Sequence, residues 1–229
     1  MSTQKGGKQQ GNWLDLTASD GHRFRGYEAR PAGAEKGQIL VIQEIFGVNN
    51  HIRNVCEDFA AEGYRALAPA LFDRAERDVE LAYDDAGIQR GREIMGKVTI
   101  DDALKDVAAG LAHLGGDGAA AIVGYCWGGT VAWAAAQRLV VRAAIGYYGG
   151  GIANRLDEAP RAPTLLHFGE KDHAIPLTVA DSVRDRHPSV MVHLYPAGHG
   201  FNCDERASYD AESAALAKQR TLGLLRAVF

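Results

Sequence analysis

A cysteine lies between two glycines where the chain passes from a predicted strand into a predicted helix. The segment from Ala121 to Gly129 reads Ala-Ile-Val-Gly-Tyr-Cys-Trp-Gly-Gly, with Cys126 at its centre. Glycines at this spacing remove side chains that would collide with the strand or the helix, so the pattern is typical of a nucleophile elbow. The following helix favours the thiolate of Cys126, and the backbone N–H of Trp127 is the expected oxyanion donor.

Two later segments supply an acid and a histidine in the chain order of α/β-hydrolases. Each is a predicted strand that runs into a polar loop, and the loops end at Asp172 and His199. The order nucleophile, acid, histidine predicts a triad in which His199 exchanges a proton with Cys126 and Asp172 orients the imidazole ring. Taken singly, these residues are open to simpler interpretations: a small buried cysteine, an ordinary loop aspartate and a capping histidine.

Short apolar runs alternate with helical patterns, which predicts an α/β fold with a mostly parallel sheet flanked by helices on both faces. The predicted strands cover residues 39–43, 65–69, 119–124, 142–148, 163–169 and 190–195. The predicted helices cover residues 55–63, 101–111, 128–138, 177–186 and 211–227. Sites in such sheets open at the carboxyl ends of the strands, where all three triad candidates fall.

Two other segments do not follow this alternation of strands and helices. The turn signal Ser19-Asp20-Gly21 lies between alternating residues and predicts two short antiparallel strands at a sheet edge. Residues 73–100 are rich in charge and contain three glycines, which predicts an irregular or helical excursion over the surface. Excursions of this kind often cover an active site.

Composition and charge favour a single globular domain. The 229 residues are 46% apolar and 24% charged, and their net charge of -4 offers no cationic surplus for nucleic acid or an anionic membrane. Residues 1–11 are expected to be a flexible lead-in and residues 12–229 one domain; without a signal-peptide pattern, a cytoplasmic location is expected. The uncharged stretch 118–137 is interpreted as a strand, a turn and a helix rather than a membrane span.

No metal or other cofactor is expected. The three cysteines, at positions 56, 126 and 203, include no Cys-x-x-Cys pair, and Cys56 is interpreted as a packing residue. One cluster of potential ligands matches no zinc-protease spacing: His167, Glu170, Asp172 and His173. The glycine run 149–151 is not followed by a phosphate-binding helix pattern.

Five segments together resemble the dienelactone hydrolase (carboxymethylenebutenolidase) family, from about Leu14 onward. They are Gln-Glu-Ile-Phe-Gly-Val-Asn from 43, Gly-Tyr-Cys-Trp-Gly-Gly from 124, Gly-Tyr-Tyr-Gly-Gly from 146, Gly-Glu-Lys-Asp-His from 169 and Ala-Gly-His-Gly-Phe from 197. The resemblance implies an α/β-hydrolase fold and a triad of Cys126, Asp172 and His199 that opens enol-lactones through a thioester acyl-enzyme. The expected partner is a small ester or lactone, and the chain is expected to be a monomer or homodimer.

The resemblance also implies roles for Glu44 and Ile45. In this family the glutamate of the Gln-Glu-Ile-Phe-Gly loop lies beside the nucleophile and takes part in switching the thiol to its reactive form when substrate binds. A carboxylate beside Cys126 disfavours a second negative charge until it is moved or neutralised. The other interpretation of Glu44 is a loop carboxylate bound to backbone. The N–H of Ile45 is implied as the second oxyanion donor.

Substrates of this family carry a carboxylate that arginines hold. Arg90 and Arg92 are candidates for one such arginine, with Arg90 preferred, while the position of the other is Cys203 here and Arg206 follows three residues later. Arginines on a surface are usually solvated charges. The replaced arginine leaves a broader carboxylesterase or thioesterase as an alternative activity. A non-catalytic binding protein or a thiol redox protein, in which Cys126 is oxidised, is the alternative from another class.

Overall fold

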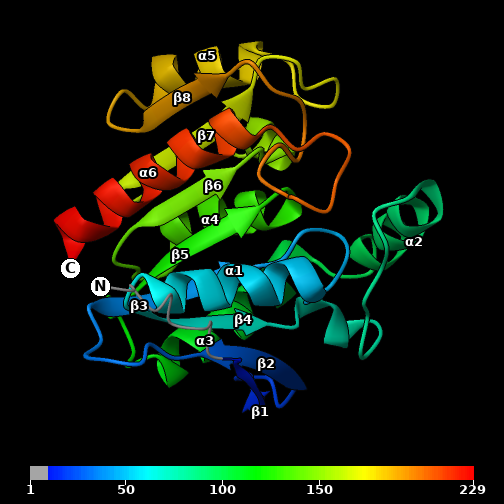
Figure 1. The fold of residues 1–229 in the computed structure, drawn as a ribbon, viewed down its shortest axis with the longest axis vertical. Coiled ribbons are helices and arrows are strands. Elements are labelled where there is room, and N and C mark those ends of the chain that lie inside the picture. The colour runs from blue at the N-terminus through cyan, green and yellow to red at the C-terminus, as the bar shows by residue number, and fades with distance from the viewer. Residues whose placement is uncertain (1–9) are drawn as a thin grey trace, which may run out of the picture.

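The computed structural model describes residues 10–229, in which strands and helices alternate along the chain (Figure 1). The strands are β1 Asn12–Thr17, β2 Arg23–Ala29, β3 Gly37–Ile42, β4 Tyr64–Pro69, β5 Ala120–Tyr125, β6 Ala144–Tyr147, β7 Thr164–Gly169 and β8 Met191–Tyr195. The helices are α1 Asn50–Ala61, α2 Asp85–Met95, α3 Ile100–His113, α4 Trp127–Arg138, α5 Thr178–Arg186 and α6 Ala211–Val228. Short 3-10 segments cover Leu71–Arg74 and Gly150–Asn154.

The strands form one sheet in the order β1-β2-β4-β3-β5-β6-β7-β8. All neighbours from β4 to β8 are parallel, while β1 pairs antiparallel with β2 and β2 antiparallel with β4. The prediction of a mostly parallel sheet with two antiparallel edge strands is therefore confirmed. Because parallel strands share a direction, the loops after β3, β5, β7 and β8 open on one side of the sheet.

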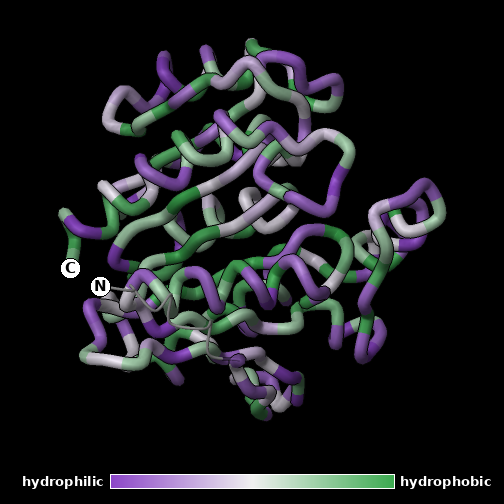
Figure 2. Tube along the Cα trace, viewed as in Figure 1, coloured by the Kyte–Doolittle hydropathy of each residue, from purple (hydrophilic) through white to green (hydrophobic). Residues whose placement is uncertain are grey.

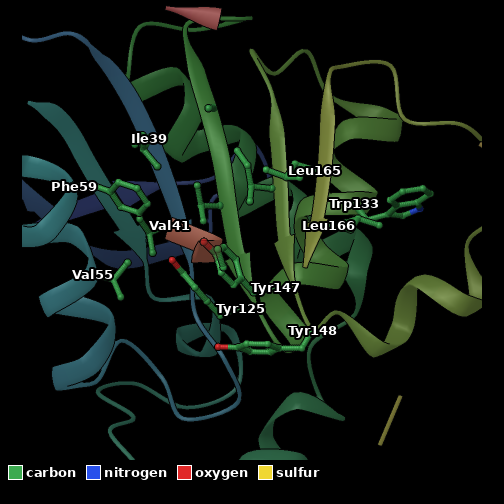
Figure 3. Packing of buried hydrophobic residues seen from close by; sticks show 14 of the residues in the cluster. Ile39, Val41, Val55, Phe59, Tyr125, Trp133, Tyr147, Tyr148, Leu165 and Leu166 are labelled. Carbon is green, nitrogen blue, oxygen red and sulfur yellow. The ribbon is translucent and has the colours of Figure 1, made fainter. Parts of the chain in front are cut away.

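The core lies on both faces of the sheet, as the sequence of β3 requires. Ile39 and Val41 pack in one apolar cluster with Val55 of α1 (Figure 3), while Leu40 packs in a second cluster with Val107 of α3. Figure 1 shows α1 and α6 in front of the sheet and α3 and α4 behind it. A strand covered on both faces is apolar at successive positions, and Figure 2 shows this as green along the central strands.

The segment between β4 and α3 forms the excursion that the sequence predicts, and α2 within it projects from the body (Figure 1). The excursion docks on the loop after β3 through an antiparallel bridge between Gly47 and Glu80. Gly91 of α2 lies against the same loop: a Cβ added to it would lie 2.1 Å from the carbonyl oxygen of Ile45. The excursion therefore covers the loop that carries Glu44 and Ile45.

Two further expectations concern the N-terminal residues and the uncharged stretch 118–137. Residues 1–9 of the expected lead-in lie outside the described residues, but Gly11 is tied to the sheet because its N–H donates to the Tyr27 hydroxyl at 2.9 Å. Residues 118–137 form β5 and most of α4, as predicted. No helix within residues 10–229 is long and apolar enough to cross a membrane.

Candidate active site

Cys126 occupies a strained turn between β5 and α4. Its φ of 54° and ψ of -117° lie where residues with a side chain are rarely found. A Cβ on Gly124 would come within 1.9 Å of the Gly128 carbonyl oxygen, and a Cβ on Gly128 within 2.4 Å of the Ile42 carbonyl oxygen. The two glycines are therefore needed for the close approach of strand and helix that lets Cys126 project at the end of β5.

The side chains of Cys126, His199 and Asp172 form a continuous chain of contacts. His199 Nε2 lies 3.2 Å from Cys126 Sγ, and His199 Nδ1 lies 2.8 Å from Asp172 Oδ2. The other Asp172 oxygen accepts hydrogen bonds from the amides of Ala174 at 2.8 Å and Ile175 at 3.2 Å. The loops after β5, β7 and β8 thus bring together three residues that are far apart in the sequence.

His199 is held so that its ring favours the protonated form. Burial lowers its pKa, but the hydrogen bonds to Asp172 and Cys126 outweigh burial and raise the pKa to about 10. The hydroxyl of Ser208 donates to the His199 carbonyl at 2.7 Å, and the Tyr148 ring lies 5.1 Å from the imidazole ring, centroid to centroid. The His199 ring is therefore restrained by a hydrogen bond to its own backbone and by the Tyr148 ring beside it.

Glu44 is fully buried and is held by two side chains rather than by backbone. Arg206 Nη1 donates to one carboxylate oxygen at 3.2 Å, and the Tyr83 hydroxyl donates to the other at 3.0 Å. Within residues 10–229 no hydrogen bond joins Glu44 to Cys126. In this arrangement the Glu44 carboxylate is bound to a cation, and the Cys126 sulfur is in contact with His199.

A cavity of about 350 Å³ opens in front of the sulfur. Its lining is mostly apolar and includes both expected oxyanion donors, Ile45 and Trp127, beside Cys126 and His199. Within the described part of the chain, neither the Ile45 amide nor the Trp127 amide donates a hydrogen bond. Such a cavity suits a small organic ligand, with two free N–H groups near the nucleophile.

The structure brings two of the three candidate arginines to this cavity. Arg92 and Arg206 line it, whereas Arg90 does not. The Arg90 guanidinium instead contacts Glu76 and Glu93, the second at 3.2 Å. Arg90, the preferred candidate from the sequence, therefore lies in a surface ion-pair group.

The Arg206 side chain passes close to the backbone of Gly200 to reach Glu44. Gly200 has a φ of 77°, and a Cβ on it would lie 2.4 Å from Arg206 Nη1. Cys203, where the resemblance implies the family arginine, is fully buried. The guanidinium that lines the cavity belongs to Arg206, three residues further along the same loop.

Sequence reasoning missed Tyr83 and Tyr148. Tyr83 lies in the charged excursion without a motif around it, and only its aromatic character among charges sets it apart. Tyr148, at the end of β6 (Figure 3), is fully buried with a φ of 38°. A bulky residue in the left-handed region is not visible in a sequence, although the glycines that follow Tyr148 mark an unusual turn.

This sheet, with an elbow after its central strand β5 and helices on both faces, defines the α/β-hydrolase class. A model described as "Dienelactone hydrolase family" matches residues 24–229, and the chain belongs to that family and is a hydrolase. A carboxymethylenebutenolidase of Pseudomonas sp. strain P51 is 30% identical over 224 residues, which cover 93% of this chain and 94% of the relative. A relative from Synechocystis sp. is 35% identical and covers 89% of this chain and 92% of its own. A crystal structure from Klebsiella pneumoniae has a TM-score of 0.78 at 32% identity and covers 93% of this chain and 98% of its own.

Proposed function

We propose that the chain hydrolyses small esters or lactones of the dienelactone type, with Cys126 as the nucleophile. The observation that carries this proposal is the row of contacts from Asp172 through His199 to Cys126, at 2.8 Å and 3.2 Å, at the wall of the cavity. A base within hydrogen-bond reach of a nucleophile, itself oriented by a buried carboxylate, is the arrangement that acyl transfer requires.

In the proposed reaction the Cys126 thiolate attacks the carbonyl carbon, with its proton held on His199. The carbon–oxygen bond to the leaving group then breaks, and His199 Nε2 gives its proton to the departing oxygen. For a lactone, ring opening leaves the product attached as a thioester. His199 next removes a proton from water, the resulting hydroxide attacks the thioester, and Cys126 leaves as a thiolate while His199 keeps the proton, which restores the starting state and releases the carboxylic acid.

The amides of Ile45 and Trp127 are the proposed oxyanion donors. Both residues line the cavity, and Trp127 begins α4, whose first N–H groups have no partner within the helix. A donor aimed at the developing negative charge stabilises the transition state more than the substrate, so it raises kcat.

The ion pair of Glu44 and Arg206 supports recognition of a substrate carboxylate. Arg206 lies 3.2 Å from Glu44 and also lines the cavity, so an incoming carboxylate competes with Glu44 for the same guanidinium. Displacement of Glu44 would free a buried carboxylate to accept a proton near the active site. Arg92, exposed and at the cavity, is the second proposed contact for the substrate.

A broader carboxylesterase is the second candidate, favoured by Cys203 at the position of a family arginine and by the apolar cavity lining. The test compares kcat/KM for a dienelactone that bears a free carboxylate with kcat/KM for a neutral aryl acetate of similar size. We expect the lactone to be preferred by more than about 100-fold, or ~2.7 kcal/mol of transition-state binding. Equal or better hydrolysis of the aryl acetate would contradict the dienelactone assignment and support the broader esterase.

A further inference from the structure

A second group of reactive side chains includes Glu44 and lies outside the proposed triad. A carboxylate oxygen of Glu44, a ring nitrogen of His51 and the Sγ of Cys203 lie within 4.8 Å of one another, and all three residues are buried. Glu44 comes from the loop after β3, His51 from the first turn of α1 and Cys203 from the loop after β8. Three separate segments therefore present an oxygen, a nitrogen and a sulfur atom to one point.

The contacts of His51 suit a metal ligand. Its Nδ1 lies 3.3 Å from an Asp204 carboxylate oxygen, which can only accept a hydrogen bond, so in the neutral ring this contact selects the tautomer with the proton on Nδ1 and the lone pair on Nε2. Nε2 is buried and has no hydrogen-bond partner in residues 10–229, and the whole residue is 3% exposed. An unsatisfied buried nitrogen is destabilising, because it has lost its hydrogen bonds to water. A carboxylate on one ring nitrogen with the other nitrogen free is the arrangement found around metal-bound histidines.

We propose that Glu44, His51 and Cys203 form a binding site for one Zn²⁺ ion. Thiolate, imidazole and carboxylate together are ligands that zinc prefers, whereas magnesium and calcium prefer oxygen alone. Bonds of roughly 2.0–2.3 Å in a tetrahedron place ligand atoms about 3.5 Å apart, so the three atoms need small side-chain movements to close on the ion. As the sulfur–zinc bond forms, the Cys203 thiol proton passes to solvent, and no electron is transferred.

The zinc site shares Glu44 with the proposed substrate site. Arg206 and Tyr83 donate to the two Glu44 oxygens, so a cation bound there competes with the guanidinium for the same carboxylate. Zinc would therefore slow hydrolysis by removing Glu44 from its exchange with Arg206. This consequence rests on the proposed function, whereas zinc binding itself does not.

The test uses Cd²⁺ as a spectroscopic probe of the same ligands, in a Cys126→Ala parent that lacks the partly exposed thiol of the cavity. We expect titration to produce the ultraviolet absorption of a cadmium–thiolate bond that saturates at one equivalent, and Zn²⁺ to abolish this absorption by displacement. Cys203→Ala in this parent should remove the band. Cys56→Ala is the matched control, because Cys56 is also fully buried and lies in α1, and it should keep the band.

Two variants test the nitrogen ligand and its support. His51→Gln should weaken Cd²⁺ affinity by more than tenfold, and Asp204→Asn should weaken it by roughly 10- to 100-fold because the ring loses its orienting carboxylate. Each variant is first compared with the parent by far-ultraviolet circular dichroism, and if Cys203→Ala does not fold, His51→Gln decides. No saturable band in the parent, a band that persists in Cys203→Ala, or unchanged affinity in His51→Gln would overturn the proposal. Since the parent lacks Cys126, these results do not depend on whether the chain hydrolyses dienelactones.

Discussion

Glu44 shows how much of this site depends on single side chains rather than on motifs. Its partner Arg206 is 162 positions away in the sequence, and the ion pair is 3.2 Å long with the carboxylate fully buried. The Gln-Glu-Ile-Phe-Gly motif identifies the glutamate, but no local pattern in the sequence shows that Arg206 pairs with it. That pairing depends on the path of the loop after β8, where Gly200 leaves room for the Arg206 side chain.

Removing the guanidinium tests whether Arg206 binds a substrate carboxylate. In Arg206→Gln we expect kcat/KM for a carboxylate-bearing lactone to fall by more than about 100-fold, because the substrate loses a charge-assisted partner, and kcat/KM for a neutral aryl acetate to fall by less than about tenfold. Steady-state kinetics on both substrates measure the split. Arg90→Gln is the control and should leave both values within about twofold, because Arg90 lies outside the cavity. Equal losses on the two substrates would exclude a carboxylate contact by Arg206.

The pKa of His199 predicts how stability changes with pH. Its pKa rises from 6.5 to about 10 on folding, so the folded chain binds this proton more tightly than the unfolded chain. The stabilisation is complete below about pH 6.5 and is lost as the pH rises towards 10. Urea unfolding of the wild type and of His199→Gln should therefore give free energies that converge over this interval. A difference that stays constant, or grows, would mean that His199 is not held as a cation.

At the scale of elements, the strands and helices behind the triad could be predicted because each has a strong local pattern. β3 and β5 are continuous apolar runs, and the glycines around Cys126 mark the turn between β5 and α4. The excursion could be recognised from its charge, but its docking could not. Gly91 lies against the Ile45 carbonyl because α2 packs on the loop after β3. In the sequence, a glycine within a charged helical segment does not indicate that contact.

Gly91→Ala tests whether α2 positions the Ile45 amide. The added methyl group would lie 2.1 Å from the Ile45 carbonyl oxygen, so α2 or the loop must move. We expect kcat to fall roughly 10- to 100-fold, as is usual when a catalytic group is displaced by about 1 Å. Gly96→Ala is the matched control at the end of the same helix, where the nearest atom is 3.4 Å away, and kcat should change little. Full activity in Gly91→Ala would show that α2 does not position the Ile45 amide.

In the whole molecule, the order of the strands brings residues that were predicted from local sequence patterns into one site. The parallel order β3-β5-β6-β7-β8 brings the loops that carry Glu44, Cys126, Asp172 and His199 to one edge, so the sequence could predict that these residues meet. The sequence could not predict which side chains from different loops contact one another beyond that edge of the sheet. Glu44, His51 and Cys203 converge only after α1 and the last loop have packed on the sheet.

Formation of an acyl-enzyme shows whether Cys126 is the nucleophile of the reaction. Wild-type enzyme mixed with an aryl acetate and quenched with acid during turnover should carry one acetyl group, and peptide mass spectrometry should place it on Cys126 as a hydroxylamine-sensitive thioester. The Cys126→Ala variant should show neither the adduct nor more than about 1% of wild-type kcat. Turnover without an adduct, together with substantial activity in Cys126→Ala, would exclude Cys126 as the nucleophile.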